Sequence, residues 1–358
     1  VVIWGEDAGY RNRALCQAQK AVLTGSMSDS QPVNSVLVYV GLDRIGDSLL
    51  KLPFVRGLRD AYPSAHITWV AGKDTSVYAG IMAPVVAGLL DEVIECAGIG
   101  LSPAELLRRP LAGRAFDLII DTQRVALASL VLWRVRHKIF VSPFGNFILS
   151  TKKPPKGYTF PRGMQRQMLD LLEIASGRTI ETPKTLDLDL DPKLETIAEA
   201  LLPDGPHYVG FAPGSGGLPK CWPLEKFIEA AAAAAGKPVF FLGPQESHWI
   251  ERIRAEAPDA LLPLQEDDVG ARHDFAPQLT IALARRLSLA VSNDSGTGHM
   301  FAVSGVPLIS LFGRTVPEKF TPMASRLTII RAQDYGGREM HLIPVTAVVA
   351  AIQAELKL

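Results

Sequence analysis

The pattern of apolar and polar positions divides the chain into alternating strand-like and helix-like segments. In the first half, short apolar runs predict buried strands at residues 35–40, 66–70, 91–95 and 116–121. Helical spacing predicts helices at residues 48–59, 122–134 and 165–175, and a helical, basic segment before the fourth strand. Strands that alternate with helices in this way are typical of a parallel sheet.

The second half repeats the alternation. Apolar runs predict strands at residues 207–212, 238–242, 289–292, 306–312 and 327–331. Helical patterns lie between them at residues 224–235, 279–286 and 300–304, and a last one covers about 345–356. We therefore predict an α/β protein with two halves of similar size.

A polar stretch with several glycines and prolines separates the halves and predicts the linker. The expected divisions are an N-terminal domain at 33–175, a linker with a short helix at 176–205, a C-terminal domain at 206–345 and a final helix at 346–358. Residues 1–32 form an extension without a clear period. We expect Met27 to be the natural start and the residues before it not to be native; an extra N-terminal helix is the alternative.

The composition is that of a globular protein. The chain has 358 residues, 47% hydrophobic and 21% charged, which is enough for two domains with separate cores. A net charge of zero gives no reason to expect nucleic acid as a partner. Three widely spaced cysteines, Cys16, Cys96 and Cys221, form no metal-binding pattern, so we expect reduced thiols in the cytoplasm. No uncharged apolar stretch approaches the roughly 18 residues of a membrane-spanning helix.

The neutral total conceals an uneven distribution of charge. Between residues 101 and 166, twelve lysines and arginines face three acidic residues. Residues 151–158 add prolines and a glycine to this charge, which predicts a basic loop. Such a segment suits an anionic substrate or an anionic membrane surface, and a solvated face is the alternative.

The turn at residues 293–299, Asn-Asp-Ser-Gly-Thr-Gly-His, lies between a predicted strand and a predicted helix. Free backbone N–H groups and the positive end of the helix dipole favour an anion there. Gly296 and Gly298 would let a phosphate approach the backbone. Asp294 and Ser295 are also good N-cap residues, so simple capping is the alternative.

Three other residues each have a functional and a structural interpretation. Lys220 follows a glycine-rich loop and could stabilise a phosphate, or be an ordinary exposed lysine. Asp47 begins a predicted helix and could be a general base, or an acid that complements the helix dipole. His299 could contact a ligand or pack in the core.

The combination of motifs is more specific than any one of them. In chain order they are Asp43-Arg-Ile-Gly-Asp47, residues 116–123 ending in Asp-Thr-Gln, Pro219-Lys-Cys-Trp-Pro-Leu224, Asn293-Asp-Ser-Gly-Thr-Gly-His299 and Leu311-Phe-Gly-Arg-Thr-Val-Pro317. This series resembles the heptosyltransferases of glycosyltransferase family 9 in order and spacing. The resemblance covers roughly residues 35–345.

The resemblance implies a GT-B fold, in which two Rossmann-like domains face each other across a cleft. It implies inverting transfer of a sugar, usually from ADP-heptose, without a metal or any cofactor, onto a lipopolysaccharide-core or related glycan. By match, Asp47 would be the catalytic base. The residues matched to the donor's diphosphate, phosphate and sugar are Ser215, Gly216, Lys220, Asp294, Ser295, Gly296, Thr297 and His299, and Glu246 would fit the ribose.

The chemistry of glycosyl transfer agrees with these assignments. Negative charge develops on the departing diphosphate, and without a metal Lys220 and the helix N-terminus must stabilise it. The acceptor would be an anionic, lipid-linked glycan, reached from the inner face of the cytoplasmic membrane. For its contacts we expect Arg44 near the amino end and Lys152, Lys153 and Arg166 in the basic segment.

Other functions remain open from the sequence. A non-hydrolysing nucleotide-sugar epimerase would share the two-domain architecture. A nicotinamide-dependent oxidoreductase is disfavoured because residues 41–46 have too few glycines for the dinucleotide fingerprint. A catalytically silent nucleotide-sugar-binding subunit is the alternative from another class.

Overall fold

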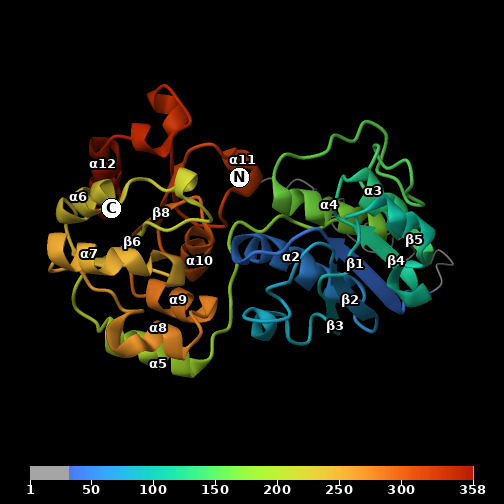
Figure 1. Cartoon of the computed structure of the whole chain (residues 1–358), viewed down its shortest axis with the longest axis horizontal. Helices are drawn as coiled ribbons and strands as arrows, with labels where there is room; N and C mark the ends of the chain where they lie inside the picture. Colours follow the sequence, from blue (N-terminus) through green and yellow to red (C-terminus); the bar gives the residue numbers. More distant parts are fainter. Residues whose placement is uncertain (1–31, 358) are drawn as a thin grey trace, which may run out of the picture. The chain divides into compact units, whose positions relative to one another are not determined.

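The computed structural model describes residues 32–357, and all of its helices and strands lie in one compact unit, Asn34–Leu358. The prediction of a start at Met27 and the alternative of an N-terminal helix concern residues outside the described ones. The predicted domain boundaries stay a prediction. What the structure gives is two separate parallel sheets (Figure 1).

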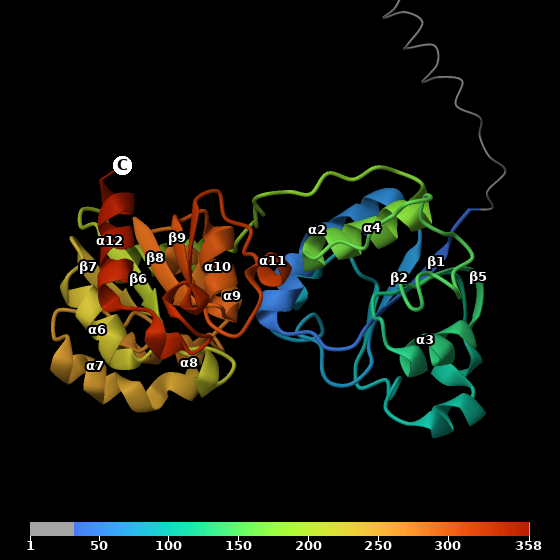
Figure 2. The ribbon, with the colours of Figure 1, turned by 90° about the horizontal axis from the view of Figure 1, so that it is seen from above.

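The first sheet has five parallel strands in the order β3-β2-β1-β4-β5. Their bounds are β1 Ser35–Val40, β2 His66–Ala71, β3 Glu92–Ile94, β4 Ala115–Asp121 and β5 Arg136–Val141. Two helices, α2 (Ile45–Ala61) and α4 (Met164–Ser176), cover one face, and α3 (Ala126–Trp133) covers the other (Figure 2). The predicted alternation of strands and helices is confirmed here.

Two features of this sheet differ from the sequence-based prediction. The strand β5 was not predicted, because its first three residues, Arg136, His137 and Lys138, give no apolar run. The helical segment predicted before β4 is instead two 3₁₀ turns, η2 (Pro103–Leu107) and η3 (Pro110–Gly113). Each turn begins with a proline, whose ring prevents the preceding residue from continuing a helix.

The second sheet also has five parallel strands, in the order β10-β9-β8-β6-β7. Their bounds are β6 Tyr208–Ala212, β7 Lys237–Phe240, β8 Leu289–Asn293, β9 Leu308–Phe312 and β10 Leu327–Arg331. The α-helices of this part are α5 Pro192–Leu201, α6 Leu224–Ala232, α7 Ile250–Glu256, α8 Val269–Arg272, α9 Pro277–Ala284, α10 Gly296–Ser304, α11 Pro317–Phe320 and α12 Val345–Leu356. All five predicted strands are confirmed, and each lies within about three residues of its predicted bounds.

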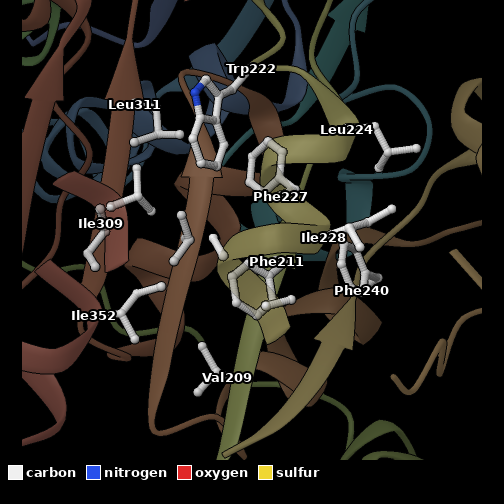
Figure 3. Close-up of a cluster of buried hydrophobic side chains, with 14 of the residues drawn as sticks. Val209, Phe211, Trp222, Leu224, Phe227, Ile228, Phe240, Ile309, Leu311 and Ile352 are labelled. Atoms are coloured by element: carbon white, nitrogen blue, oxygen red, sulfur yellow. The ribbon is translucent and has the colours of Figure 1, made fainter. Parts of the chain in front are cut away.

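Both faces of the second sheet are covered, which explains why its strands have continuous apolar runs. One core packs α6, α7 and α12 against the sheet, and another packs α5, α9 and α10 against the opposite face. Figure 3 shows the first of these cores, where Trp222, Phe227 and Phe211 lie together. Every residue of β6, β8 and β9 is buried.

The strand orders locate the places where ligands bind in such sheets. The order of connection reverses between β1 and β4 in the first sheet and between β6 and β8 in the second. Ligands of open parallel sheets bind at such switch points, beyond the carboxyl ends of the strands. The loops that follow β1, β4, β6 and β8 are therefore the expected walls of a site.

Trp222 anchors the loop that follows β6. Its side chain is fully buried, its ring meets Phe227 edge-on at 5.0 Å, and its Nε1 donates to the carbonyl of Ile343 at 2.9 Å. The backbone N–H of Trp222 donates to Oδ1 of Asn293 at 3.0 Å, and Nδ2 of Asn293 donates to the carbonyl of Pro213 at 2.7 Å. The side chain of Asn293 thus ties the ends of the glycine-rich loop to β8.

We predict that Trp222→Ala lowers the free energy of unfolding by about 3–5 kcal/mol, because it leaves a large cavity in this core. The half-exposed Trp133 is the matched control, and Trp133→Ala should cost about 1 kcal/mol or less. Denaturant unfolding of both variants measures the difference. Equal losses would show that Trp222 does not support the core.

Candidate active site

A cavity of about 310 Å³ lies at the carboxyl ends of β1, β6 and β8. Its walls come from both sheets, and the residues that line it are Arg44, Gly46, Asp47, Ser215, Gly216, Lys220, Asp294, Ser295, Gly296, His299 and Phe320. Most of the residues proposed from the sequence thus meet at one place, although their roles remain predictions. Glu246, Thr297, Lys152, Lys153 and Arg166 are not among the lining residues.

Asp47 lies in the first turn of α2, where its carboxylate faces the cavity and is partly buried. Burial raises the pKa of Asp47, while the charge of Lys51 opposes the shift and that of Asp43 adds to it. A carboxylate with a raised pKa is a better proton acceptor than an ordinary one. This environment suits a general base.

A buried ion pair between Lys51 and Asp43 stabilises this turn of α2. Lys51, one helical turn after Asp47, donates to the carboxylate of Asp43 and, at 3.0 Å, to the carbonyl of Leu42. The Asp43 carboxylate also accepts from Trp69 Nε1 at 2.6 Å and Ser76 Oγ at 2.9 Å. These bonds fix the ammonium of Lys51 near Asp47. Lys51 was not identified from the sequence, because its partners come together only in the folded chain.

The opposite wall offers donors and positive charge. The helix α10 begins at Gly296, and its N-cap Ser295 accepts from the N–H of Gly298 at 3.3 Å. Ser215 Oγ donates to the carbonyl of Asp294 at 3.3 Å, which holds the glycine-rich loop beside this helix start. Free N–H groups at a helix N-terminus favour an anion.

Two cations flank the glycine-rich loop. The ammonium of Lys220 lies 3.9 Å from the carboxylate of Asp294 and is 45% exposed, so the pair is weak and the charge is available to a ligand. The guanidinium of Arg44 lies next to Gly216, where a Cβ atom would be 3.5 Å from Nη1. Together with the N-terminus of α10 they form a setting for an anion such as a diphosphate.

Asp294 is a second carboxylate in the cavity. Burial raises its pKa, and the charge of Asp47 adds to the increase, while a hydrogen bond from Thr315 and the charge of Lys220 oppose it. An anionic ligand would need the nearby cations, because these two carboxylates otherwise repel it.

His299 links the two sheets. Its imidazole is buried, and burial lowers its pKa to about 4, so the ring is neutral at physiological pH. A Cβ atom on Gly46 would lie only 2.8 Å from Cδ2 of His299. The residue therefore packs closely on α2, as the structural interpretation predicts, and it also lines the cavity, while its contact with a ligand stays a prediction.

Glu246 and Thr297 lie just outside the cavity. Oε2 of Glu246 accepts from the N–H of Gly243 at 3.0 Å, and its carboxylate lies so close to Gly214 that a Cβ there would be 2.5 Å from Oε1. Glu246, in the 3₁₀ turn that follows β7, thus lies against the glycine-rich loop. Thr297 lies in the first turn of α10 and is partly buried.

A second cavity of about 350 Å³ adjoins the first and shares Asp47 and Phe320 with it. Its other lining residues come from α2, the loop after β4, α4 and the neighbourhood of α11: Leu42, Lys51, Thr122, Gln123, Arg124, Phe160, Met164, Gln167, Met168, Leu171 and Lys319. Asp47 therefore lies between a cavity rich in phosphate-binding features and a cavity formed mainly by the first sheet's elements. Gln123, the last residue of one of the sequence motifs, lines this second cavity. Arg124 and Lys319 lie outside the motifs and were not identified from the sequence.

The residues predicted to contact the acceptor do not lie together. Arg44 lines the first cavity with the predicted donor residues. Lys152 donates to the carbonyl of Ala175 at 2.6 Å at the end of α4. Arg166 pairs with Asp170 and, at 2.8 Å, with Glu173. Neither these two residues nor Lys153 line either cavity, and the charge of Arg166 is used within α4.

Within residues 32–357, no group of three or more His, Cys, Asp or Glu residues is arranged to hold a metal ion. Among the same residues, no helix is long and apolar enough to cross a membrane. Cys96 and Cys221 are free thiols, and Cys16 lies outside the described residues.

We predict that Gly46→Ala destabilises the protein by about 1–3 kcal/mol, because the new methyl group overlaps the buried ring of His299. Thermal unfolding measures the loss. Gly80 is the control, since a Cβ there meets nothing within 4 Å. A Gly46→Ala variant as stable as Gly80→Ala would mean that α2 and α10 are not in close contact.

Comparison with known proteins gives one consistent family. The profile of glycosyltransferase family 9 (heptosyltransferase) matches residues 105–342. The lipopolysaccharide core heptosyltransferase OpsX of Haemophilus influenzae is 24% identical over 307 residues, which cover 80% of this chain and 81% of that protein. The lipooligosaccharide heptosyltransferase 2 of the same organism is 32% identical over 136 residues, which span 37% of this chain and 38% of that protein.

A solved structure confirms the fold. The ADP-heptose lipopolysaccharide heptosyltransferase II of Escherichia coli has a TM-score of 0.62 at 18% identity, and the match covers 90% of this chain and 98% of that one. At this identity the likeness shows the fold alone. The predicted GT-B arrangement of two Rossmann-like domains is thereby confirmed.

Proposed function

Because the chain belongs to glycosyltransferase family 9, we propose that it transfers a heptose from ADP-heptose to a hydroxyl group of a lipopolysaccharide-core or related glycan. The transfer inverts the anomeric carbon and needs neither a metal nor a cofactor. The names of the relatives support the choice of donor and acceptor, since they include ADP-heptose and the lipopolysaccharide core. The acceptor is an anionic, lipid-linked glycan at the inner face of the cytoplasmic membrane.

The position of Asp47 between the two cavities is the observation that carries this proposal. In the first cavity, the N-terminus of α10 and the cations of Lys220 and Arg44 receive the diphosphate. Glycosyl transfer leaves negative charge on the departing diphosphate, and these groups stabilise that charge as it develops. The nucleoside end lies toward Glu246, whose carboxylate accepts from a ribose hydroxyl.

In the second cavity, the acceptor hydroxyl approaches Asp47 from the side of the first sheet. Asp47 accepts the hydroxyl proton as the oxygen forms its bond to the anomeric carbon. The bond from that carbon to the diphosphate breaks on the opposite face, which inverts the configuration. Arg124 and Lys319, both exposed, add positive charge to this cavity, which suits an acceptor with phosphate or carboxylate groups.

The donor can be identified by calorimetry with ADP, UDP, GDP and NAD, each with and without magnesium. We expect the tightest binding for ADP and no effect of magnesium. Lys220→Met should weaken ADP binding about tenfold, because it removes one charge-assisted contact to the diphosphate. Lys193→Met, on the exposed start of α5, is the control and should bind as the wild type does.

Other outcomes of this titration would redirect the proposal. A preference for UDP or GDP would keep the reaction type and change the donor. Binding of NAD alone would contradict glycosyl transfer, and a requirement for magnesium would contradict a metal-free leaving-group site.

The role of Asp47 is tested by Asp47→Asn, which keeps the size of the side chain and removes its basicity. We expect the transfer rate to fall at least about 100-fold, while ADP affinity stays within about twofold. Asp60→Asn, at the exposed end of the same helix, is the control.

The pH dependence of the wild type follows from the raised pKa of Asp47. Only the deprotonated carboxylate can accept a proton, so activity should fall as the pH drops through this pKa, which burial raises above the ordinary value of an aspartate. Full activity in Asp47→Asn would refute the assignment and favour a silent or differently catalysed site.

A further inference from the structure

A third cavity, of about 290 Å³, lies on the first sheet at the amino ends of β4 and β5. Its lining residues are Arg109, Pro110, Gly113, Arg114, Arg134, Val135 and Arg136. The carboxyl ends of the same strands face the candidate active site, so this arginine cavity is a separate feature. It has no role in the reaction proposed above.

Of the four arginines in the cavity, Arg109, Arg134 and Arg136 have no acidic partner among the described residues, whereas Arg114 is paired with Glu92. Arg114 donates to Glu92 at 2.7 and 2.9 Å, and Arg136 donates to the carbonyl of Gly113 at 2.8 Å. Arg109 and Arg134 are exposed, and among the described residues no acidic side chain lines the cavity. An anion held there would meet the three guanidinium groups that have no acidic partner, those of Arg109, Arg134 and Arg136.

The acidic residues of the same stretch are all occupied elsewhere. Glu105 accepts three backbone N–H groups, from residues 100–102, at 2.6–2.8 Å. Asp117 pairs with Lys138 at 2.9 Å and accepts the N–H of Asn34 at 2.8 Å. Asp121, the last residue of β4, is fully buried. These acidic residues therefore do not cancel the positive charge of this surface.

An exposed apolar stripe adjoins the arginine cavity. Along α3, Ala126, Leu130 and Trp133 follow helical spacing on the exposed side, while Val131 and Leu132 are buried against the sheet. Leu130 is 38% and Trp133 49% exposed. The neighbouring η2 turn packs against α3 and adds Leu107, which is 88% exposed. Figure 2 shows α3 on the face of the sheet opposite to α2 and α4.

The stripe joins two basic places. Just before α3 lies Arg124, which lines the cavity assigned to the acceptor, and just after it lies Arg134 in the arginine cavity. A helix of this length spans about 12 Å. A lipid surface lying along α3 would therefore border the acceptor cavity.

We propose that the surface formed by α3, η2 and the arginine cavity docks on an anionic lipid bilayer. Trp133, Leu130 and Leu107 enter the headgroup region, and the arginine cavity takes a lipid phosphate. Apolar side chains beside a basic cluster are the combination that binds anionic bilayers at their surface. Docking itself does not depend on the proposed function. Only the purpose of docking, to bring a lipid-linked acceptor to Asp47, rests on that function.

The charge and the apolar residues together favour a bilayer over other occupants. Free phosphate would satisfy the arginines and leave the exposed Trp133 and Leu107 in water. A second copy of the chain in a two-fold contact would bring two arginine clusters together, which disfavours the pairing. Only an anionic surface with an apolar interior matches both parts.

The test is flotation of the full chain with vesicles, which needs no turnover. Phosphatidylcholine vesicles with about one-third phosphatidylglycerol should bind the protein, and pure phosphatidylcholine vesicles should not. Arg109→Ala with Arg134→Ala should lower partitioning about 30-fold, at about fivefold per arginine. Trp133→Ser with Leu107→Ser should lower it at least tenfold. Arg252→Ala with Arg254→Ala, on the exposed α7, is the matched control.

Calorimetry with ADP on every variant separates loss of docking from loss of folding, and separates a failure of this inference from a failure of the proposed donor. Equal binding to neutral and anionic vesicles would overturn the inference, as would unchanged binding of the arginine variant. Binding of inorganic phosphate without vesicle binding would show an anion site instead. Self-association abolished by Trp133→Ser, without vesicle binding, would show a contact between copies.

Discussion

The packing of α2 against α10 is the contact on which the candidate active site depends. Gly46 has no side chain, so the ring of His299 can lie against the first turn of α2. Burial keeps this imidazole neutral, so the contact brings no charge into the site. Asp47 follows Gly46 directly, and it therefore lies opposite the start of α10. Both helices begin at the carboxyl end of a strand beside a switch point, so one contact joins the two sheets where each offers a binding site.

Charges of opposite sign alternate through the site that this contact creates. Asp43 holds Lys51, Lys51 lies one turn from Asp47, and Lys220 lies within 3.9 Å of Asp294. If Lys51 moved away, the buried carboxylate of Asp43 would lose its cationic partner, which is costly. The charge of Lys51 therefore stays beside Asp47. Lys220 is bound only weakly and can turn to a ligand. Asp47 is thus held in a fixed electrostatic setting, whereas Lys220 remains free to respond to an anionic ligand.

The sequence sufficed for the fold and for the core of the candidate site because both depend on local signals. Apolar runs gave nine of the ten strands of the two sheets, and the strand they missed begins with Arg136 and carries no such run. Glycine-bearing turns after predicted strands gave the residues that line the first cavity. What the sequence could not give are partners distant along the chain. The hydrogen bond from Trp69 to Asp43, and the position of Arg44 beside Gly216, depend on how the chain folds back on itself.

The basic stretch of residues 101–166 shows why a count of charges does not define a binding surface. Its arginines and lysines serve different structures. Arg114 is tied to Glu92, Lys138 to Asp117, and Arg166 to acids within its own helix. Among the arginines of this stretch without an acidic partner, Arg124 lines the second cavity, and Arg109, Arg134 and Arg136 line the arginine cavity. Because α3 connects these places and exposes apolar side chains between them, the excess of positive charge extends along one face of the first sheet, from the second cavity to the arginine cavity. Under the proposed function, a lipid-linked acceptor reaches Asp47 from the first sheet, while the nucleotide enters from the second.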